Sequence, residues 1–557
     1  MSVVATTDVV IVGSGVAGAL VADRLARHGV GVVVLEAGPP VDRDRAVEIF
    51  RQAPAKVPES PYPSTPHAPR PTVLDIGVPG TGYFVQEGPE PFGSTYERVV
   101  GGTTWHWLGS TPRLLPSDLE MLTRFGVGRD WPLSYDDLEP FYVEAERELG
   151  VAGDGTEDQG SPRSAGFPMP PIPLSFLDTV VDRAARRIGL RVLSTPQARN
   201  TETYNDRHRC VGNSNCIPIC PIGAKYDAVI HLDRAAEHGA RIIADAVVHE
   251  VLVRADGTAR GVRFRRPDGT DDEVLGRAVV MAANAIETPK ILLMSDGGRG
   301  IANRSGQVGQ NLMDHPIALS YALSAPEEPV YPQRGPLSTA GIESPRQAAT
   351  RGQRSAFRVE VGNDGWRFPI GDPTFEFTQG PFPALREGGA ALAARWRDHV
   401  AHEIRFASLT EQLPDRANTV TPAFDLVDDI GIPRPRITFS IDAYTRAGLD
   451  EAQELHERLF TAMRARERTH VPFAFGAGHI MGTTIMGTSA ADSVTDGFGR
   501  SHDVPNMWIV GSSVFPTAGT ANPTLTLAAL ALRTAVALRA ALPSLPAAGR
   551  SAATAGA

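Results

Sequence analysis

The stretch Asp8-Val-Val-Ile-Val-Gly13-Ser-Gly15-Val-Ala-Gly18 decides the fold of this chain. The apolar run at its start predicts a short buried strand over residues 8–12. A glycine-rich turn then leads into a helical pattern over residues 19–28 and a second apolar run over residues 31–35. Strand, glycine turn, helix and strand form the first half of a dinucleotide-binding unit, which predicts an α/β fold with a Rossmann-like domain.

Each glycine of this turn meets a separate steric requirement. Gly13 permits the tight turn, Gly15 lets a pyrophosphate approach the backbone, and Gly18 lets the helix pack on the strand. Glu36 ends the second strand, where it is placed to accept hydrogen bonds from ribose hydroxyls and to repel a 2′-phosphate. FAD and NAD both use this pattern. The ending Glu36-Ala-Gly38, with no compact mononucleotide-binding half directly after it, favours FAD.

Length and composition limit the classes of protein to which this chain can belong. The chain has 557 residues, enough for two large lobes, and a formal net charge of -10 that argues against binding to nucleic acid. Because Arg533 and Arg539 interrupt the longest apolar run, we expect no transmembrane segment, and we expect a disordered tail over residues 543–557. No signal peptide follows Met1, so a cytoplasmic location is expected, while export with a partner that carries a signal stays open.

All three cysteines of the chain, Cys210, Cys216 and Cys220, lie close together, and Pro221 follows them at once. The cluster is too tight for a disulfide framework, and an odd number leaves one thiol unpaired. Three thiolates on a short loop can hold an iron–sulfur group or zinc. Their spacing is not a common one for either, so three buried, inert thiols are an equal alternative at this point.

Six further motifs follow along the chain: Arg98-Val-Val-Gly-Gly-Thr-Thr-Trp-His-Trp107, Asn284-Ala-Ile-Glu-Thr-Pro-Lys-Ile-Leu-Leu-Met-Ser295, Val308-Gly-Gln-Asn-Leu-Met-Asp-His-Pro316, His479-Ile-Met-Gly-Thr-Thr-Ile-Met-Gly487, Asn506-Met-Trp-Ile-Val-Gly511 and Asn522-Pro-Thr-Leu-Thr526. Their order and spacing resemble the glucose–methanol–choline (GMC) oxidoreductases over nearly the whole chain. The resemblance implies a Rossmann-like FAD-binding domain beside a substrate domain built on an antiparallel sheet, α+β overall. It also implies an enzyme that oxidises CH–OH groups.

Within that family, the chain most resembles the flavoprotein subunits of bacterial gluconate, fructose and sorbitol dehydrogenases. The resemblance rests on Gly126-Val-Gly-Arg-Asp-Trp-Pro132, Tyr135-Asp-Asp-Leu138 and Cys216-Ile-Pro-Ile-Cys-Pro-Ile-Gly-Ala224. Several relatives hold a three-iron (3Fe-4S) cluster on three cysteines beside the flavin, which implies metal ligands at Cys210, Cys216 and Cys220. The electrons would then pass to an acceptor protein or a quinone.

The group also resembles pyranose, glycoside and aminoglycoside oxidases. The substrate is therefore expected to be a sugar or sugar-like molecule, an aminoglycoside among them. An oxidase that makes hydrogen peroxide without a cluster is the alternative to the dehydrogenase. A flavin-fold protein with only a binding role is disfavoured by the intact fingerprint glycines, and a nicotinamide enzyme by the single fingerprint.

The resemblance places the catalytic residues near the end of the chain. His479 is the expected base that takes the hydroxyl proton, because histidine has a suitable pKa. Asn522 is its expected partner at the same hydroxyl. A core histidine and an Asn-Pro turn before a helix over residues 526–538 are the structural alternatives. Asp496 and His502, near these motifs, receive no role.

The same resemblance predicts the flavin contacts. His106 lies between two tryptophans and is expected either to bind the flavin covalently or to form a noncovalent wall of its pocket. Val248, with Val247, would contact the adenine through backbone groups. The full set of expected cofactor-binding residues is Gly13, Gly15, Gly18, Glu36, Gly101, Gly102, Thr103, His106, Val248, Gly511, Asn522, Pro523 and Thr524.

The expected domains are discontinuous in sequence. The FAD-binding domain takes residues 1–42, 95–115, 225–320 and 488–542, and residues 43–94 form a lid or a partner-contact insert. The substrate domain takes residues 116–224 and 321–487 and carries the cysteine loop at 210–221. Residues 374–379 and 403–409 are the expected strands of its sheet.

Overall fold

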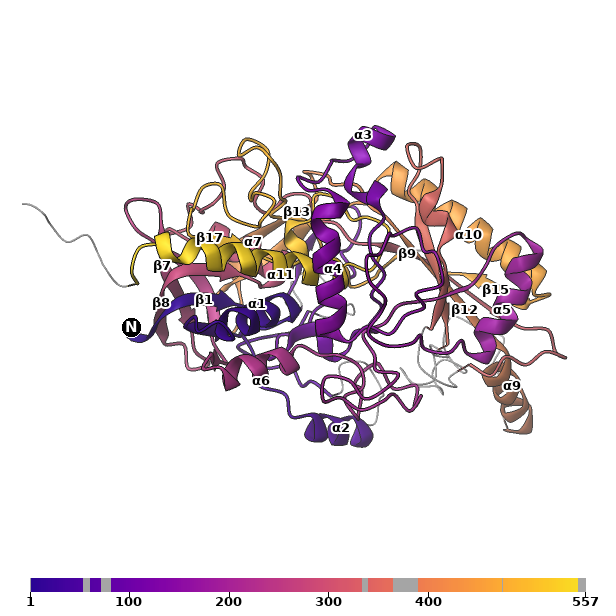
Figure 1. Ribbon diagram of the computed structural model, residues 1–557. Helices are drawn as coiled ribbons and strands as arrows, with labels where there is room; N and C mark the ends of the chain where they lie inside the picture. The colour runs from indigo at the N-terminus through magenta and orange to yellow at the C-terminus, as the bar shows by residue number, and fades with distance from the viewer. Residues whose placement is uncertain are drawn as a thin grey trace, which may run out of the picture.

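The computed structural model describes residues 2–53, 61–71, 82–332, 339–363, 389–472 and 474–548. Two seven-stranded sheets lie side by side along the long axis of the molecule (Figure 1). On the left of Figure 1, the N-terminal strand and the yellow helix near the C-terminus mark the first sheet. On the right, the orange helix α10 marks the second.

The first sheet is mainly parallel and carries the glycine fingerprint. Its strand order is β5-β2-β1-β8-β7-β6, and β17 pairs with β8. Only the β6–β7 and β7–β8 pairs are antiparallel among the described pairs of this sheet. The Rossmann-like α/β domain expected from the sequence is therefore confirmed. The strands are β1 (Val3–Val12), β2 (Val32–Leu35), β5 (Arg241–Ile243), β6 (Val247–Val253), β7 (Ala259–Arg265), β8 (Asp271–Met281) and β17 (Met507–Ile509).

Two element boundaries near the fingerprint differ from the sequence expectation. β1 starts at Val3 rather than at residue 8, because its first residues already pair with β8. The helix α1 (Val16–Ala26) begins three residues earlier than expected, since Gly15 has extended backbone and serves as its N-cap. The helix therefore starts directly at the turn, where its free N–H groups can face a ligand.

Several helices pack around the first sheet. The helix α11 (Thr524–Ala541) packs against α1 and against α4 (Tyr135–Leu149). By length and composition the segment Thr524–Ser544 could cross a membrane, but 61% of its apolar window is buried, as in a core helix. α6 (Val229–Glu237) packs against α1, and α7 (Asn284–Met294) packs against β6 and β13 (Thr419–Val427).

The second sheet is antiparallel in every described pair, as the family resemblance implies. Its order is β15-β9-β12-β11-β10-β4, with β16 paired to β9. The expected strand over residues 403–409 is β12, whereas the one expected over 374–379 lies outside the described residues. The elements are β4 (Leu193–Ser194), β9 (Pro316–Leu323), β10 (Ala340–Ile342), β11 (Phe357–Gly362), β12 (Glu403–Thr410), β15 (Arg466–His470), β16 (Phe475–Gly476), α5 (Phe176–Arg187), α9 (Gly389–His402) and α10 (Ala443–Ala462).

The described parts of the insert at residues 43–94 hold a helix and an edge strand. α2 (Arg43–Gln52) follows the first βαβ unit, and β3 (Val85–Glu87) joins β13 (Thr419–Val427) and β14 (Pro433–Thr438) in a three-stranded sheet. The short helix α3 (Met121–Phe125) lies at the top of Figure 1. The role of the insert at residues 43–94 as a lid or a partner contact stays a prediction.

Two expected domain assignments separate parts of the chain that pack together. α4 lies in the segment expected to belong to the substrate domain, yet it shares a core with α11 and α1. β9 crosses residue 320 and pairs with the second sheet along its whole length. Tertiary packing of helix faces decides such boundaries, and motif positions do not reveal it. The division into domains stays a prediction.

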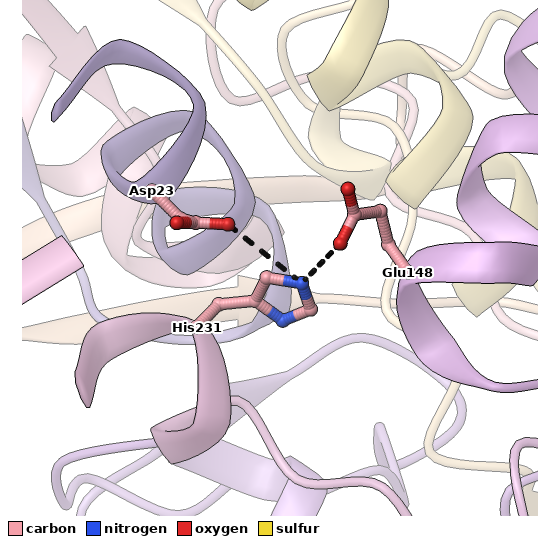
Figure 2. A group of neighbouring side chains, drawn as sticks. All are labelled: Asp23, Glu148 and His231. Carbon is pink, nitrogen blue, oxygen red and sulfur yellow. Dashed lines mark hydrogen bonds and ion pairs between the residues drawn. The ribbon is translucent and has the colours of Figure 1, made fainter. Parts of the chain in front are cut away.

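A buried polar cluster joins the three helices α1, α4 and α6. Figure 2 shows Asp23 of α1, Glu148 of α4 and His231 of α6, with His231 Nε2 3.2 Å from Glu148 and 4.0 Å from Asp23. Burial would raise the pKa of Glu148, but the hydrogen bond from His231 and the charge of Arg27 hold it at about 2. Arg27 also pairs with Asp23 at 2.7 Å. Arg27 also lies 3.1 Å and Arg234 lies 3.6 Å from Glu148, so two guanidinium groups accompany the two carboxylates, and the cluster ties the three helices together.

Candidate active site

A cavity of about 450 Å³ has walls from both large sheets. It brings together residues that lie far apart in sequence, among them most of those expected to bind cofactor or substrate. Gly18, Gly101 and the three cysteines are not on its wall. The expected residues that do line it are Gly13, Gly15, Glu36, Gly102, Thr103, His106, Val248, His479, Gly511, Asn522, Pro523 and Thr524.

The fingerprint glycines are needed for close packing. Gly13 has a φ of +102°, and a Cβ there would lie 2.6 Å from the carbonyl oxygen of Ala282. A Cβ on Gly18 would lie 2.0 Å from the carbonyl oxygen of Gly13. Gly18 therefore acts behind the wall, where it lets α1 approach the turn. No side chain caps the N-terminus of α1, whose first residues line the cavity, so its N–H groups remain available to a pyrophosphate.

Glu36 is fixed at the end of β2 by its neighbours. Its Oε2 accepts hydrogen bonds from the N–H and the hydroxyl of Ser14 at 3.0 and 2.6 Å. Burial raises the pKa of this carboxyl in spite of those bonds. The Ser14 hydroxyl in turn accepts the N–H of Gly101 at 3.1 Å. Ser14 thus links the fingerprint to the second glycine motif and explains the place of Gly101 beside the wall.

The motif around His106 forms another wall. A short 3₁₀ turn, Gly102–Trp105, leads into His106, whose Nδ1 lies 3.2 Å from Glu97 Oε1 without making a hydrogen bond. Trp105 is buried and packs as core. Lys225 fixes this turn from behind, because its Nζ donates to the carbonyls of Trp105 and Trp107 at 2.8 and 2.5 Å. Burial lowers the pKa of Lys225 to about 7.

The loop that carries His479 is anchored through backbone hydrogen bonds. The N–H groups of Ala477 and His479 donate to Asp314 Oδ1 at 3.2 and 3.1 Å. A Cβ on Gly476 would lie 2.6 Å from Asp314 Oδ2, so glycine is required for this approach. Burial raises the pKa of Asp314 to about 6. The glycines of this motif therefore let the loop lie against a buried carboxyl.

Hydrogen bonds from the protein fix which ring nitrogen of His479 carries the proton. His315 Nε2 lies 3.0 Å from the carbonyl oxygen of Gly519, which can only accept, so this nitrogen carries a hydrogen. His315 Nδ1 is then an acceptor and lies 2.9 Å from His479 Nδ1, which must donate to it. His479 Nε2 is left with its lone pair at the cavity. Burial lowers the pKa of His479 well below its ordinary value, and the nearby His315 and Arg358 lower it further.

Asn522 lies directly beside this lone pair. Its Nδ2 is 3.4 Å from His479 Nε2 and 3.4 Å from Glu360 Oε1. Its Oδ1 accepts a hydrogen bond from Arg358 Nη1 at 2.9 Å, which fixes the orientation of the amide. α11 begins just after it, at Thr524, so Asn522 also precedes a helix N-terminus at the cavity. The structure therefore brings His479 and Asn522 together at one point of the wall.

The cysteine loop lies behind the wall that carries His106. Ile217, next to Cys216, lines the cavity, while Cys216 and Cys220 are buried. The three sulfurs do not all lie within 4.8 Å of one another, whereas three thiolates on one zinc ion would. Burial raises the pKa of the Cys210 thiol, and the charges of the other two thiols add to this. The geometry therefore disfavours zinc at this loop.

Comparisons with known proteins agree with this site. Two profiles described as GMC oxidoreductase match residues 129–317 and 414–531, and one described as FAD binding domain matches residues 6–47. The chain belongs to the GMC oxidoreductase family. As a member of that family it is an FAD-dependent oxidoreductase that acts on alcohols.

Relatives with assigned activities cover nearly the whole chain. The fructose dehydrogenase large subunit of Gluconobacter japonicus is 36% identical, over 96% of this chain and 98% of its own length. Paromamine 6′-oxidase of Streptomyces fradiae is 30% identical, over 95% of this chain and 91% of its own length. The crystal structure of pyridoxine 4-oxidase from Mesorbium loti shares the fold with a TM-score of 0.64 at 18% identity, over 96% and 99% of the two chains.

Several residues of this GMC site are not apparent from sequence motifs. Lys225 directly follows the cysteine stretch over residues 216–224, and His315 lies inside the motif that ends at Pro316. Their positions in or beside these motifs could have indicated both residues. No sequence motif indicates Arg358 or Glu360, because their positions depend on how β11 pairs in the second sheet. Asp496 and His502, which received no role, do not line the cavity.

Proposed function

We propose that the protein oxidises an alcohol group on a sugar or sugar-like substrate, an aminoglycoside among them, with His479 as the base. One observation carries this proposal. The hydrogen-bonded series from the Gly519 carbonyl through His315 leaves His479 Nε2 unprotonated at the cavity, 3.4 Å from Asn522 Nδ2. A lone pair and an N–H donor side by side suit a hydroxyl group, which needs an acceptor for its proton and a donor for its oxygen.

Each residue then has a defined task. His479 Nε2 takes the hydroxyl proton, and the lowered pKa of His479 keeps it unprotonated before the reaction. Asn522 Nδ2 donates to the substrate oxygen as negative charge develops there. Arg358 holds the Asn522 amide so that its N–H groups face the cavity. When bound, FAD supplies a hydride acceptor at its N5 atom. The fingerprint turn, Glu36 and the turn at Gly102–Trp105 would hold it.

The donor set around the cysteine loop fits an anionic iron–sulfur group. Arg199 Nε and Nη1 and Arg207 Nε are buried without a hydrogen-bond partner among the described residues. Lys225 and Arg199 act on the thiols as positive charges. Buried, unpaired donors next to three thiols favour a negatively charged occupant. A cluster held by Cys210, Cys216 and Cys220 would transfer single electrons from the flavin side to an external acceptor.

Three findings support this electron exit. Ile217 of the cysteine loop lines the same cavity as His106. Lys225 bonds the His106 turn to the chain that follows the cysteines. One relative is named as the large subunit of fructose dehydrogenase, which favours a partner protein or a quinone as acceptor. Paromamine 6′-oxidase favours oxygen as acceptor instead.

We also propose a cytoplasmic location.

The base assignment is tested by His479→Ala in anaerobic stopped flow. The variant should keep bound FAD, while its flavin reduction by a sugar substrate falls at least about a hundredfold, as expected for a lost general base. His502→Ala is the matched control, since this half-buried histidine bonds to Ser493 and lies off the cavity. Flavin reduction within roughly tenfold of wild type would show that another group takes the proton.

The acceptor and the cofactors need separate measurements. Iron analysis and an absorption spectrum on protein purified without oxygen test the cluster, and a peroxide assay beside a dye-reduction assay separates oxidase from dehydrogenase. The covalent bond at His106 stays a prediction. Flavin that remains with the denatured protein would confirm it, and flavin released into the supernatant would show a noncovalent wall.

A further inference from the structure

The substrate side of the cavity is one face of the antiparallel sheet. β11 and β12 pair so that Glu360 lies opposite Ala407 and Gly362 lies opposite Arg405. Because alternate residues of a strand share a face, all four belong to the same side. Glu360, Arg405 and Ala407 line the cavity. The mechanism above uses none of these three side chains.

Small residues on this face leave room at the cavity. Ala407 presents only a methyl group opposite Glu360. A Cβ on Gly362 would lie 2.2 Å from Arg405 Nε, so the missing side chain lets the guanidinium lie across the neighbouring strand. This wall therefore presents a carboxylate and a guanidinium over two small residues. Such a surface matches a molecule with several hydroxyl groups better than a simple alcohol.

Glu360 is held through one of its carboxylate oxygens, Oε1, while the other, Oε2, has no hydrogen-bond partner among the described residues. Arg358 Nη1 donates to Glu360 Oε1 at 2.5 Å, and Asn522 Nδ2 lies 3.4 Å from the same oxygen. Arg358 is itself fixed by Glu343 at 2.7 Å. No described residue bonds to Glu360 Oε2. A fixed carboxylate oxygen on a cavity wall, next to the catalytic amide, suits a hydrogen-bond donor on the substrate.

We propose that Glu360 is a specificity-determining residue, whose Oε2 accepts a hydrogen bond from a hydroxyl or ammonium group on the carbon next to the one that is oxidised. The proposal rests on the function proposed above, because it places the reacting hydroxyl between His479 and Asn522. Asn522 Nδ2 is equally far from His479 Nε2 and from Glu360 Oε1. The neighbouring substituent of the substrate therefore comes next to Glu360.

This arrangement selects a chemical class. Vicinal diols and vicinal amino alcohols, the units of sugars and aminosugars, can donate to Oε2. A methyl ether at the neighbouring position cannot donate, and a carboxylate there would meet Glu360 as a like charge. The cavity should thus accept neutral and cationic sugars and disfavour oxidation next to an acid group.

The experiment uses rigid ring alcohols, so that the neighbouring position is defined. Steady-state turnover with a dye as electron acceptor is measured for the FAD-loaded protein with trans-1,2-cyclohexanediol, trans-2-aminocyclohexanol, trans-2-methoxycyclohexanol and cyclohexanol. A hydrogen bond to a charged group predicts kcat/KM about tenfold to a hundredfold higher for the diol than for the methoxy compound. The aminoalcohol should equal or exceed the diol.

Two variants then assign the effect to one carboxylate. In Glu360→Gln the ratio of the aminoalcohol to the methoxy compound should fall at least about tenfold, because the charge is lost. Glu343→Gln is the matched control, since Glu343 also pairs with Arg358 but does not line the cavity. Its ratio should stay at the wild-type value. FAD content is measured for each variant.

The outcomes separate this inference from the proposed function. Equal kcat/KM for diol and methoxy compound in the wild type overturns the role of Glu360, as does an unchanged ratio in Glu360→Gln. Reduction by fructose or paromamine but by none of the ring diols also overturns it, because the vicinal pair would then not be the recognised unit. The proposed function fails separately, if no sugar reduces the flavin or if His479→Ala keeps the wild-type rate.

Discussion

Replacement of His315 by leucine tests the physical basis of the catalytic base. The side chains are of similar size, but leucine can neither accept from His479 Nδ1 nor donate to the Gly519 carbonyl. In the wild type, these contacts at 2.9 and 3.0 Å keep the proton of His479 on Nδ1 and the lone pair on Nε2. Without them, the tautomer with the proton on Nε2, which cannot act as a base, competes.

The size of the effect follows from one lost hydrogen bond. A typical net contribution of about 0.5–1.5 kcal/mol favours the active tautomer, and 1.4 kcal/mol corresponds to a factor of ten. We therefore expect kcat/KM for alcohol oxidation to fall roughly tenfold. This is much less than the loss of about a hundredfold or more on removal of the base itself. The unpaired Gly519 carbonyl should cost a further ~1–3 kcal/mol of unfolding free energy.

The pH profile provides a readout that a merely structural defect would not change. His315 contributes to the low pKa of His479, so in His315→Leu this pKa rises, although burial still holds it down. The acid limb of kcat/KM should therefore move to higher pH. His456→Leu is the matched control, because His456 is equally buried, bonds to Ser320 and Ser408, and lies on α10, which packs against the second sheet, off the cavity. An unchanged pH profile in His315→Leu, or an equal rate loss in His456→Leu, would refute the reasoning.

Three further outcomes follow from the same structure. Because the pKa of His479 is lowered, the base stays unprotonated as pH falls through 6.5. Wild-type kcat/KM should therefore remain level there and fall only at clearly lower pH. An acid limb of the kcat/KM profile centred at pH 6.5 would contradict this. Gly18→Ala should lose FAD on gel filtration, since its Cβ would lie 2.0 Å from a backbone carbonyl oxygen, whereas Gly166→Ala, with open space around it, should retain FAD. Cys216→Ser combined with Cys220→Ser should remove iron and dye reduction but leave FAD content and flavin reduction by substrate; iron that persists in metal analysis would show that these thiols are not the ligands.

The sequence predicts the flavin side of the site better than the substrate side, for a physical reason. The fingerprint turn depends on contacts between residues close in sequence. Its glycines are required because a Cβ atom at these positions would clash with backbone carbonyl oxygens in any chain that makes this turn. His479 and Asn522 come from separate motifs, and only their shared order along the chain indicates that they meet. Residues of β11 and β12 face the cavity because of strand pairing, which no local pattern encodes. The start of α1 is misplaced by three residues because an extended glycine can serve as N-cap.

The paired histidines restrict where the proton can go after the reaction. His315 Nε2 is bound to a carbonyl oxygen, and a carbonyl cannot take up a proton and pass it on. The pair therefore fixes the orientation of His479 and does not conduct protons away from it. The proton taken by Nε2 must leave through the cavity itself, on the side from which substrate enters. The exit that we propose for the electrons lies elsewhere, behind the His106 turn, where Lys225 and the cysteine loop lie. If proton and electrons leave by different faces, a bound product should block release of the proton but not oxidation of the flavin by an acceptor. This order of events distinguishes a cluster-linked dehydrogenase from an oxidase, in which oxygen must reach the flavin through a cavity that product still occupies.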